Sequence, residues 1–110
     1  QTKLHRNNDL PAVICSDGSQ AWYQTGKKHR DNDLPAIIQS ENSQFWYQNG
    51  KRHRDNDLPA IEWRSGTRYW CQNDKLHRDN DLPAVIREDG SEAWYQHGTQ
   101  EWYQLGKRIR

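Results

Sequence analysis

The chain has 110 residues, of which 32% are hydrophobic, and its 16 basic residues nearly balance its 15 acidic ones. The resulting net charge of +1 excludes strong overall attraction to nucleic acid or to an anionic membrane. Six Trp and five Tyr argue against disorder, because large aromatic side chains can stabilise a shallow core. No membrane span or signal peptide is visible. There is no Met, and the first residue already lies within a repeat, so we expect a processed product or a piece of a longer protein.

The same residues return every 24 positions. A fixed period of this size indicates a repeat protein whose short copies stack on their neighbours. We expect one array over residues 1–110, with copies at about 3–26, 27–50, 51–74 and 75–98 and an atypical terminal hairpin at 99–110. The repeated histidines are His5, His29, His53 and His77, each followed by Arg.

Each copy predicts two strands and two turns. In the second copy, the apolar stretch 34–39 reads as a strand that opens with Leu-Pro-Ala, and the aromatic stretch 45–48 reads as the next strand. The turns fall at Glu41-Asn42 and Asn49-Gly50, and Asn-Gly between two strands is a strong hairpin signal. The polar stretch 51–57 then leads into the next copy as a loop.

These elements predict an all-β protein, since no segment shows the 3.6-residue apolar rhythm of a helix. Two architectures fit. The favoured one is an elongated antiparallel sheet of tandem hairpins, in which equal positions lie about 10 Å apart. The alternative is a parallel β-solenoid, which would stack like charges at about 4.8 Å.

The tryptophans are the predicted core. Neighbouring side chains of a strand face opposite sides, so each Trp-Tyr pair must divide between the core and the other face. We expect the tryptophans to pack against the aliphatic residues that follow Leu-Pro-Ala. The predicted core residues are Trp22, Trp46, Trp70, Trp94, Val13, Ile37, Ile61 and Val85.

The candidate interaction surface combines the second aromatic row with a basic stripe. Exposed aromatics could grip a protein, a sugar or stacked bases; alternatively, Arg side chains of the loops cover them. The Asp residues of the neighbouring loops are expected to neutralise much of the basic stripe by ion pairs. The surface residues are Lys27, Arg30, Lys51, Arg54, Lys75, Arg78, Tyr23, Tyr47 and Tyr95.

No residue pattern predicts catalysis. His29-Arg30-Asp31 and its copies spell the start of a kinase catalytic loop, but a kinase needs further motifs and a far larger fold. Histidines one copy apart cannot converge on one metal ion, and Asp55-Asn56-Asp57 lacks the remaining features of an EF-hand loop. We therefore predict no enzyme activity, no metal and no cofactor.

The two cysteines are predicted to be unpaired. Cys15 and Cys71 occupy different positions of the repeat and lie more than two copies apart, beyond the Cα separation of about 7 Å that a disulfide spans. This usage favours a reducing compartment.

Residues 46–53, Trp-Tyr-Gln-Asn-Gly-Lys-Arg-His, resemble MORN repeats in a variant form. The resemblance covers nearly the whole chain. In that family Gly usually follows the His, whereas Arg30, Arg54 and Arg78 stand there in this sequence, and the next strand usually opens with spaced glycines instead of Leu-Pro-Ala. The resemblance implies a β-hairpin array without catalytic residues. The repeated residues of the copies also resemble those of repeat proteins from large DNA viruses and some bacteria. This resemblance implies that the protein is located in the cytoplasm or in the interior of a virion or host cell.

From the sequence we expect a non-enzymatic scaffold that binds another protein or serves a structural assembly. The alternatives are a peripheral membrane or phosphoinositide binder that uses the basic stripe, and a carbohydrate binder that uses exposed aromatics. Nucleic acid is not an expected partner.

Overall fold

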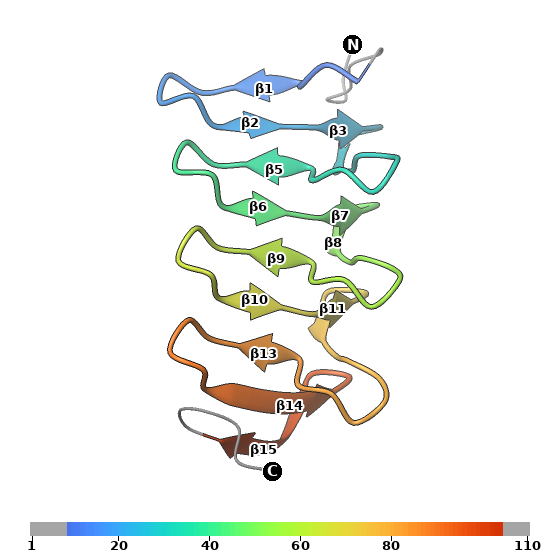
Figure 1. Ribbon diagram of the computed structural model, residues 1–110. Helices are drawn as coiled ribbons and strands as arrows, with labels where there is room; N and C mark the ends of the chain where they lie inside the picture. Colours follow the sequence, from blue (N-terminus) through green and yellow to red (C-terminus); the bar gives the residue numbers. More distant parts are fainter. Residues whose placement is uncertain (1–8, 105–110) are drawn as a thin grey trace.

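The computed structural model describes residues 9–104, and this part of the chain contains strands and turns but no helix. An open nine-stranded sheet forms the body of a molecule that measures 52 × 26 × 19 Å, and its strands follow one another like the rungs of a ladder (Figure 1). In spatial order the sheet consists of β1 (Val13–Ile14), β2 (Gln20–Ala21), β5 (Ile37–Ile38), β6 (Gln44–Phe45), β9 (Ile61–Glu62), β10 (Arg68–Tyr69), β13 (Val85–Ile86), β14 (Glu92–Gln96) and β15 (Thr99–Gln104).

Three separate two-stranded ribbons lie along one side of this sheet (Figure 1). They are β3 (Tyr23–Gln24) with β4 (Lys27–Lys28), β7 (Tyr47–Gln48) with β8 (Lys51–Arg52), and β11 (Cys71–Gln72) with β12 (Lys75–Leu76). Every strand pair of the described residues is antiparallel. The predicted all-β array of tandem hairpins is therefore confirmed, and the parallel solenoid is excluded.

The aromatic stretch of a copy is not one continuous strand, as expected, but two. In the second copy, β6 ends at Phe45 and β7 begins at Tyr47, so Trp46 lies between the sheet and the ribbon. The N–H of Trp46 donates to Ala60 C=O at 2.7 Å, while its own C=O accepts the N–H of His53 at 3.1 Å. Because its two backbone groups bind different segments, the chain leaves the sheet at this residue.

The two sides of the sheet carry different turns. We call the side with the turns at 15–19, 39–43, 63–67 and 87–91 the tip edge, and the side with the three ribbons and the Asp-Asn-Asp loops that follow them the ribbon edge (Figure 1). At the ribbon edge, Asn49 and Gly50 have φ of 53° and 85°, the pattern of the type I′ turn that suits a two-residue hairpin. At the tip edge, the turn needs one residue of positive φ, which is Gly18 in the first copy and Asn42 in the second.

Leu-Pro-Ala precedes the strand instead of opening it. The strand of the second copy begins at Ile37, after Leu34, Pro35 and Ala36. Pro35 and Ala36 are buried, whereas Leu34 is 36% exposed. Proline has no N–H to donate to a sheet, which explains why pairing starts only after it, with Ala36 N–H donating to Phe45 C=O.

The four tryptophans of the predicted core are all buried, between 2% and 7% exposed. Their predicted aliphatic partners differ from one another, because Ile61 and Val85 are buried while Val13 and Ile37 are only half-buried. In the sheet register these aliphatics face the residue before each tryptophan: Val13 pairs with Ala21, and Ile37 with Phe45.

The array ends in a longer hairpin. β14 and β15 pair along most of their length around the turn at His97-Gly98, with Trp94 opposite Trp102 and a bulge between Trp94 and Tyr95. Two aromatic strands thus lie side by side in this hairpin. Both cysteines are free, Cys15 exposed and Cys71 buried, which confirms the predicted absence of a disulfide between them. Residues 9–104 contain no helix with the length and apolarity needed to cross a membrane.

Candidate functional site

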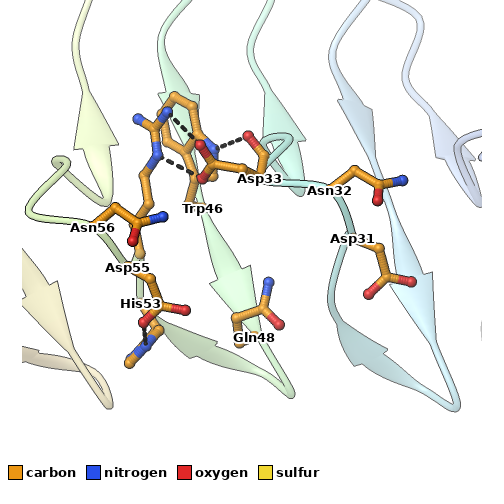
Figure 2. A pocket seen from close by; sticks show the side chains of 9 residues that line it. Asp31, Asn32, Asp33, Trp46, Gln48, His53, Asp55 and Asn56 are labelled. Carbon is orange, nitrogen blue, oxygen red and sulfur yellow. Dashed lines mark hydrogen bonds and ion pairs between the residues drawn. The ribbon is translucent and has the colours of Figure 1, made fainter.

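An arginine clamp is the central element of the ribbon edge. The guanidinium of Arg54 lies 3.7 Å from the ring centroid of Trp46, and its Nε and Nη2 donate to the two carboxylate oxygens of Asp33 at 2.9 and 3.2 Å (Figure 2). Its Nη1 donates to Pro59 C=O at 3.1 Å. A planar guanidinium suits this combination of stacking and two-point binding, which a lysine could not reproduce.

The clamp recurs in neighbouring copies with nearly the same geometry. Arg30 stacks on Trp22 at 3.7 Å and binds Asp9, and Arg78 stacks on Trp70 at 3.8 Å and binds Asp57. The three arginine side chains are only 12–14% exposed. They belong to the predicted interaction surface, but the structure uses them to cover the tryptophans and to join successive copies.

The Asp-Asn-Asp loop presents the groups that the clamp needs. Asn32 and Asp33 have φ of 65° and 56°, and Leu34 N–H donates to Asp31 C=O at 3.4 Å, so the loop turns tightly. Asn and Asp tolerate this left-handed conformation better than other residues with a side chain. The C=O of Asp33 consequently accepts a hydrogen bond from the indole N–H of Trp46 at 3.0 Å. The Asp33 carboxylate pairs with the Arg54 guanidinium.

The histidine of each copy joins one ribbon to the next. Nδ1 of His29 accepts the backbone N–H of Asn49 at 3.0 Å, and Nε2 lies 2.8 Å from Asp31 Oδ1. His53 makes the same two contacts with Asn73 and Asp55. A hydrogen bond from Gln24 and the one from His29 hold the pKa of Asp31 below its usual value. The histidine is therefore a connecting residue in these copies.

The exposed part of the predicted surface is a row of lysines. Lys27, Lys51 and Lys75 are exposed, occupy the same position of successive ribbons, and form no ion pair within residues 9–104. The neighbouring Lys28 instead places its Nζ 5.1 Å from the ring centroid of Tyr47.

The predicted tyrosine row is half-buried at Tyr23, Tyr47 and Tyr95. In the third copy the row contains Cys71, whose pKa burial raises to about 11. Nearby, Arg52 Nε donates to Asp74 Oδ1 at 2.7 Å, and this hydrogen bond holds the pKa of Asp74 below its usual value.

Shallow polar grooves repeat along the ribbon edge. A groove of about 230 Å³ in the second copy is matched by one of about 260 Å³ in the third. Asp31, Asn32 and Gln48 line the first groove together with the residues of the clamp (Figure 2). Two further grooves lie between successive ribbons and are lined by the exposed lysines, for example Lys27 and Lys51. A groove of the same kind is thus repeated along the ribbon edge.

Sequence reasoning missed several connecting side chains. The amide of Gln48 donates to Arg30 C=O at 3.2 Å and that of Gln72 to Arg54 C=O at 2.8 Å, so this glutamine also links copies. Its recurrence directly after the aromatic pair, as in Gln24 and Gln96, is a signal that could have pointed to it.

No protein-family model, curated protein or solved structure matches the chain. Within residues 9–104, no three His, Cys, Asp or Glu side chains are grouped closely enough to hold a metal ion. The tandem hairpins of the antiparallel sheet are compatible with a repeat protein, and the ribbon edge is its most distinctive surface.

Proposed function

We propose that this chain is a non-enzymatic scaffold that binds an extended, acidic segment of another protein along its ribbon edge. The observation that carries the proposal is the row of exposed lysines, Lys27, Lys51 and Lys75, on equivalent ribbons beside repeated shallow grooves. Arg30, Arg54 and Arg78 of the same stripe are held in clamps, whereas Lys27, Lys51 and Lys75 are exposed and can be reached by an incoming partner.

The spacing of the row favours an extended partner. Successive ribbons follow the two-strand step of the sheet, so equal positions lie about 10 Å apart. A polyproline II segment rises about 3.1 Å per residue with three residues per turn, so every third side chain lies on one face at about 9 Å intervals. An acidic residue at every third position would therefore meet successive lysines.

The same features support a classification as a variant of the MORN repeat. The array of antiparallel hairpins and the aromatic-Gln-Asn-Gly-basic pattern around Asn49-Gly50 agree with that resemblance. The Arg that replaces the usual Gly after the histidine has a role of its own, because Arg54 and its counterparts form the clamps. Scaffolding is what the resemblance implies.

The test is binding of labelled peptides to the chain, measured by fluorescence anisotropy. One peptide contains about five Glu-Pro-Pro triplets, and the other has the same composition with its acidic residues clustered. We expect the regular peptide to bind more tightly. The double variant Lys27→Gln/Lys51→Gln should weaken this binding by about tenfold, since each exposed ion pair contributes up to about 1 kcal/mol.

A matched control is the double variant Arg64→Gln/Arg68→Gln, which removes the same charge from exposed residues outside the lysine row. It should leave binding nearly unchanged. Equal weakening by the two variants, or no binding of the regular peptide to the unmodified chain, would contradict the proposal. Flotation with anionic vesicles that depends on Lys27 and Lys51 would instead favour the membrane alternative.

A further inference from the structure

The histidine contacts between ribbons require an uncharged imidazole. Nδ1 of His29, His53 and His77 accepts the backbone N–H of Asn49, Asn73 and His97 at 3.0, 3.1 and 3.1 Å. An imidazole nitrogen that accepts a hydrogen bond carries no proton, so the single proton of the neutral ring must be on Nε2. That nitrogen lies 2.7–2.8 Å from the carboxylate of Asp31, Asp55 or Asp79 and donates to it.

We propose that these three contacts make the ribbon edge loosen in mildly acidic solution. A second proton can be added to the ring only at Nδ1, where it would face the backbone N–H of the next ribbon. The accepted hydrogen bond is then lost and two donors oppose each other. The carboxylate still binds the charged ring through Nε2, so the histidine stays with its own loop while the next ribbon loses an attachment point.

Neighbouring charges act on the ring in both directions. Around His53, the carboxylates of Asp55, Asp31 and Asp33 favour a charged ring, whereas Arg54, Lys27 and Lys51 oppose it. Around His77, the carboxylates of Asp79, Asp55 and Asp57 favour a charged ring, whereas Arg78, Lys51 and Lys75 oppose it.

The imidazole rings of His77 and His97 stack with their centroids 4.4 Å apart. We call each contact between a histidine Nδ1 and the backbone N–H of the next ribbon a joint. His77 is the most buried of the three joint histidines, at 8% exposure. The contact made by His77 is therefore the most shielded from solvent of the three.

Other bonds keep the loosened ribbons from separating at once. Gly50 N–H donates to Lys28 C=O at 2.8 Å in the first joint, and Asp74 N–H donates to Arg52 C=O at 2.8 Å in the second. The acid form should therefore keep its nine-stranded sheet, and the change should be concentrated in the ribbons. Because Lys27 and Lys51 lie on ribbons that His29 joins, the loosening would also alter the spacing of the lysine row.

The sign of the pH effect follows from proton binding. If the closed joint needs a neutral ring, the open form binds more protons, and stability rises with pH across the titration of imidazole. The joint should therefore be complete in neutral solution and weaken as the solution becomes acidic. Asp31 contributes separately: its lowered pKa adds stability that is present above its usual value of 3.8 and is lost only as pH falls through the lower folded value.

Nitrogen-15 NMR of the whole chain tests the tautomer directly. At about pH 7.5 the three rings should be Nε2-protonated, with the amide signals of Asn49, Asn73 and His97 shifted as expected for donors to nitrogen. Amide exchange at these positions should report a closed-to-open ratio that falls by up to about tenfold per pH unit below the titration. Rings protonated on Nδ1 at neutral pH would overturn the proposal.

The variant test uses His→Gln at positions 29, 53 and 77. A glutamine carbonyl can accept the same N–H at any pH, so the fall in Tm between about pH 7.5 and about pH 5 should shrink with each replacement. The control is His97→Asn, which removes an imidazole that accepts no ribbon N–H within residues 9–104 and places the residue found at Asn49 and Asn73. It should retain the pH dependence of the first two joints. An unchanged fall in Tm in the His53→Gln variant would overturn the proposal even if the triple variant did not fold.

Discussion

The tip edge and the ribbon edge join the copies with the same kind of bond but with different acceptors. At the tip edge, hydroxyl oxygens accept a backbone N–H of the next copy: Ser19 that of Ser40 at 3.1 Å, Ser43 that of Arg64 at 3.0 Å, and Thr67 that of Glu88 at 3.3 Å. At the ribbon edge the acceptor is a histidine ring nitrogen.

The two edges thus use different acceptors for the same kind of backbone N–H, and the acceptor decides whether the attachment depends on pH. In each case a turn residue of the next copy donates its backbone N–H, and the accepted hydrogen bond attaches that turn to the preceding copy. A hydroxyl accepts this hydrogen bond at any ordinary pH, whereas imidazole accepts it only while uncharged. The tip edge therefore provides constant attachment, and the ribbon edge combines attachment with charge, clamps and sensitivity to acid.

The largest expected effect tests whether side chains at the ribbon edge contribute more to the free energy of unfolding than those at the tip edge. Trp46→Ala removes a side chain that is 5% exposed, together with the surface on which Arg54 stacks. We expect a loss of about 3–5 kcal/mol in the free energy of unfolding, measured by urea denaturation. Trp63→Ala, at the tip edge, removes a half-buried ring that packs on Phe45 and Tyr69 and should cost about 1–2 kcal/mol. Equal losses would show that the two edges stabilise the chain equally.

The second effect compares the thiols of the two edges. Cys15 is exposed at the tip edge, whereas Cys71 is buried in a ribbon, where burial raises its pKa to about 11. Because the thiolate is the reactive species, about one Cys71 in ten thousand is reactive at pH 7. Labelling with a thiol reagent should modify Cys15 at least about a hundredfold faster, as followed by mass spectrometry of the peptides. Comparable rates would mean that the third ribbon opens frequently.

A smaller effect sharpens the contrast between the two acceptors. Ser43→Ala leaves the N–H of Arg64 without its acceptor at a position that is 0% exposed, so we expect a loss of about 1–3 kcal/mol. The loss should be the same at about pH 7.5 and about pH 5, because a hydroxyl does not titrate there. A loss that changes with pH would assign the acid sensitivity to the tip edge.

The smallest effect concerns the turns. Asn42, at φ 78°, occupies the tip position that Gly18, Gly66 and Gly90 hold in the other copies, so Asn42→Gly should stabilise the chain by about 0.5 kcal/mol. Asp74 occupies the corresponding ribbon position of Gly26 and Gly50, at φ 72°. Asp74→Gly should bring no gain, because it also removes the acceptor of Arg52. Thermal unfolding of the two variants separates these outcomes.

Local chemistry determined much of the fold in advance. The 24-residue period predicts the copies, and turn residues such as Asn49-Gly50 predict the hairpins, because their left-handed conformation is a local property. The apolar and aromatic stretches predict strands but do not show where one sheet ends. The break at Trp46 depends on the C=O of Ala60 and the N–H of His53, which come from other parts of the array.

The roles of the repeated polar residues were decided only by the tertiary structure. The sequence places a basic and an acidic stripe side by side and predicts their neutralisation, but it does not distinguish Arg54, which is clamped against Asp33, from Lys51, which is exposed. It shows that His29, His53 and His77 recur at one position of the copies without saying what they contact. Both answers depend on contacts about 20 residues apart, between Arg54 and Asp33 or His53 and Asn73, and such contacts exist only once neighbouring copies have stacked.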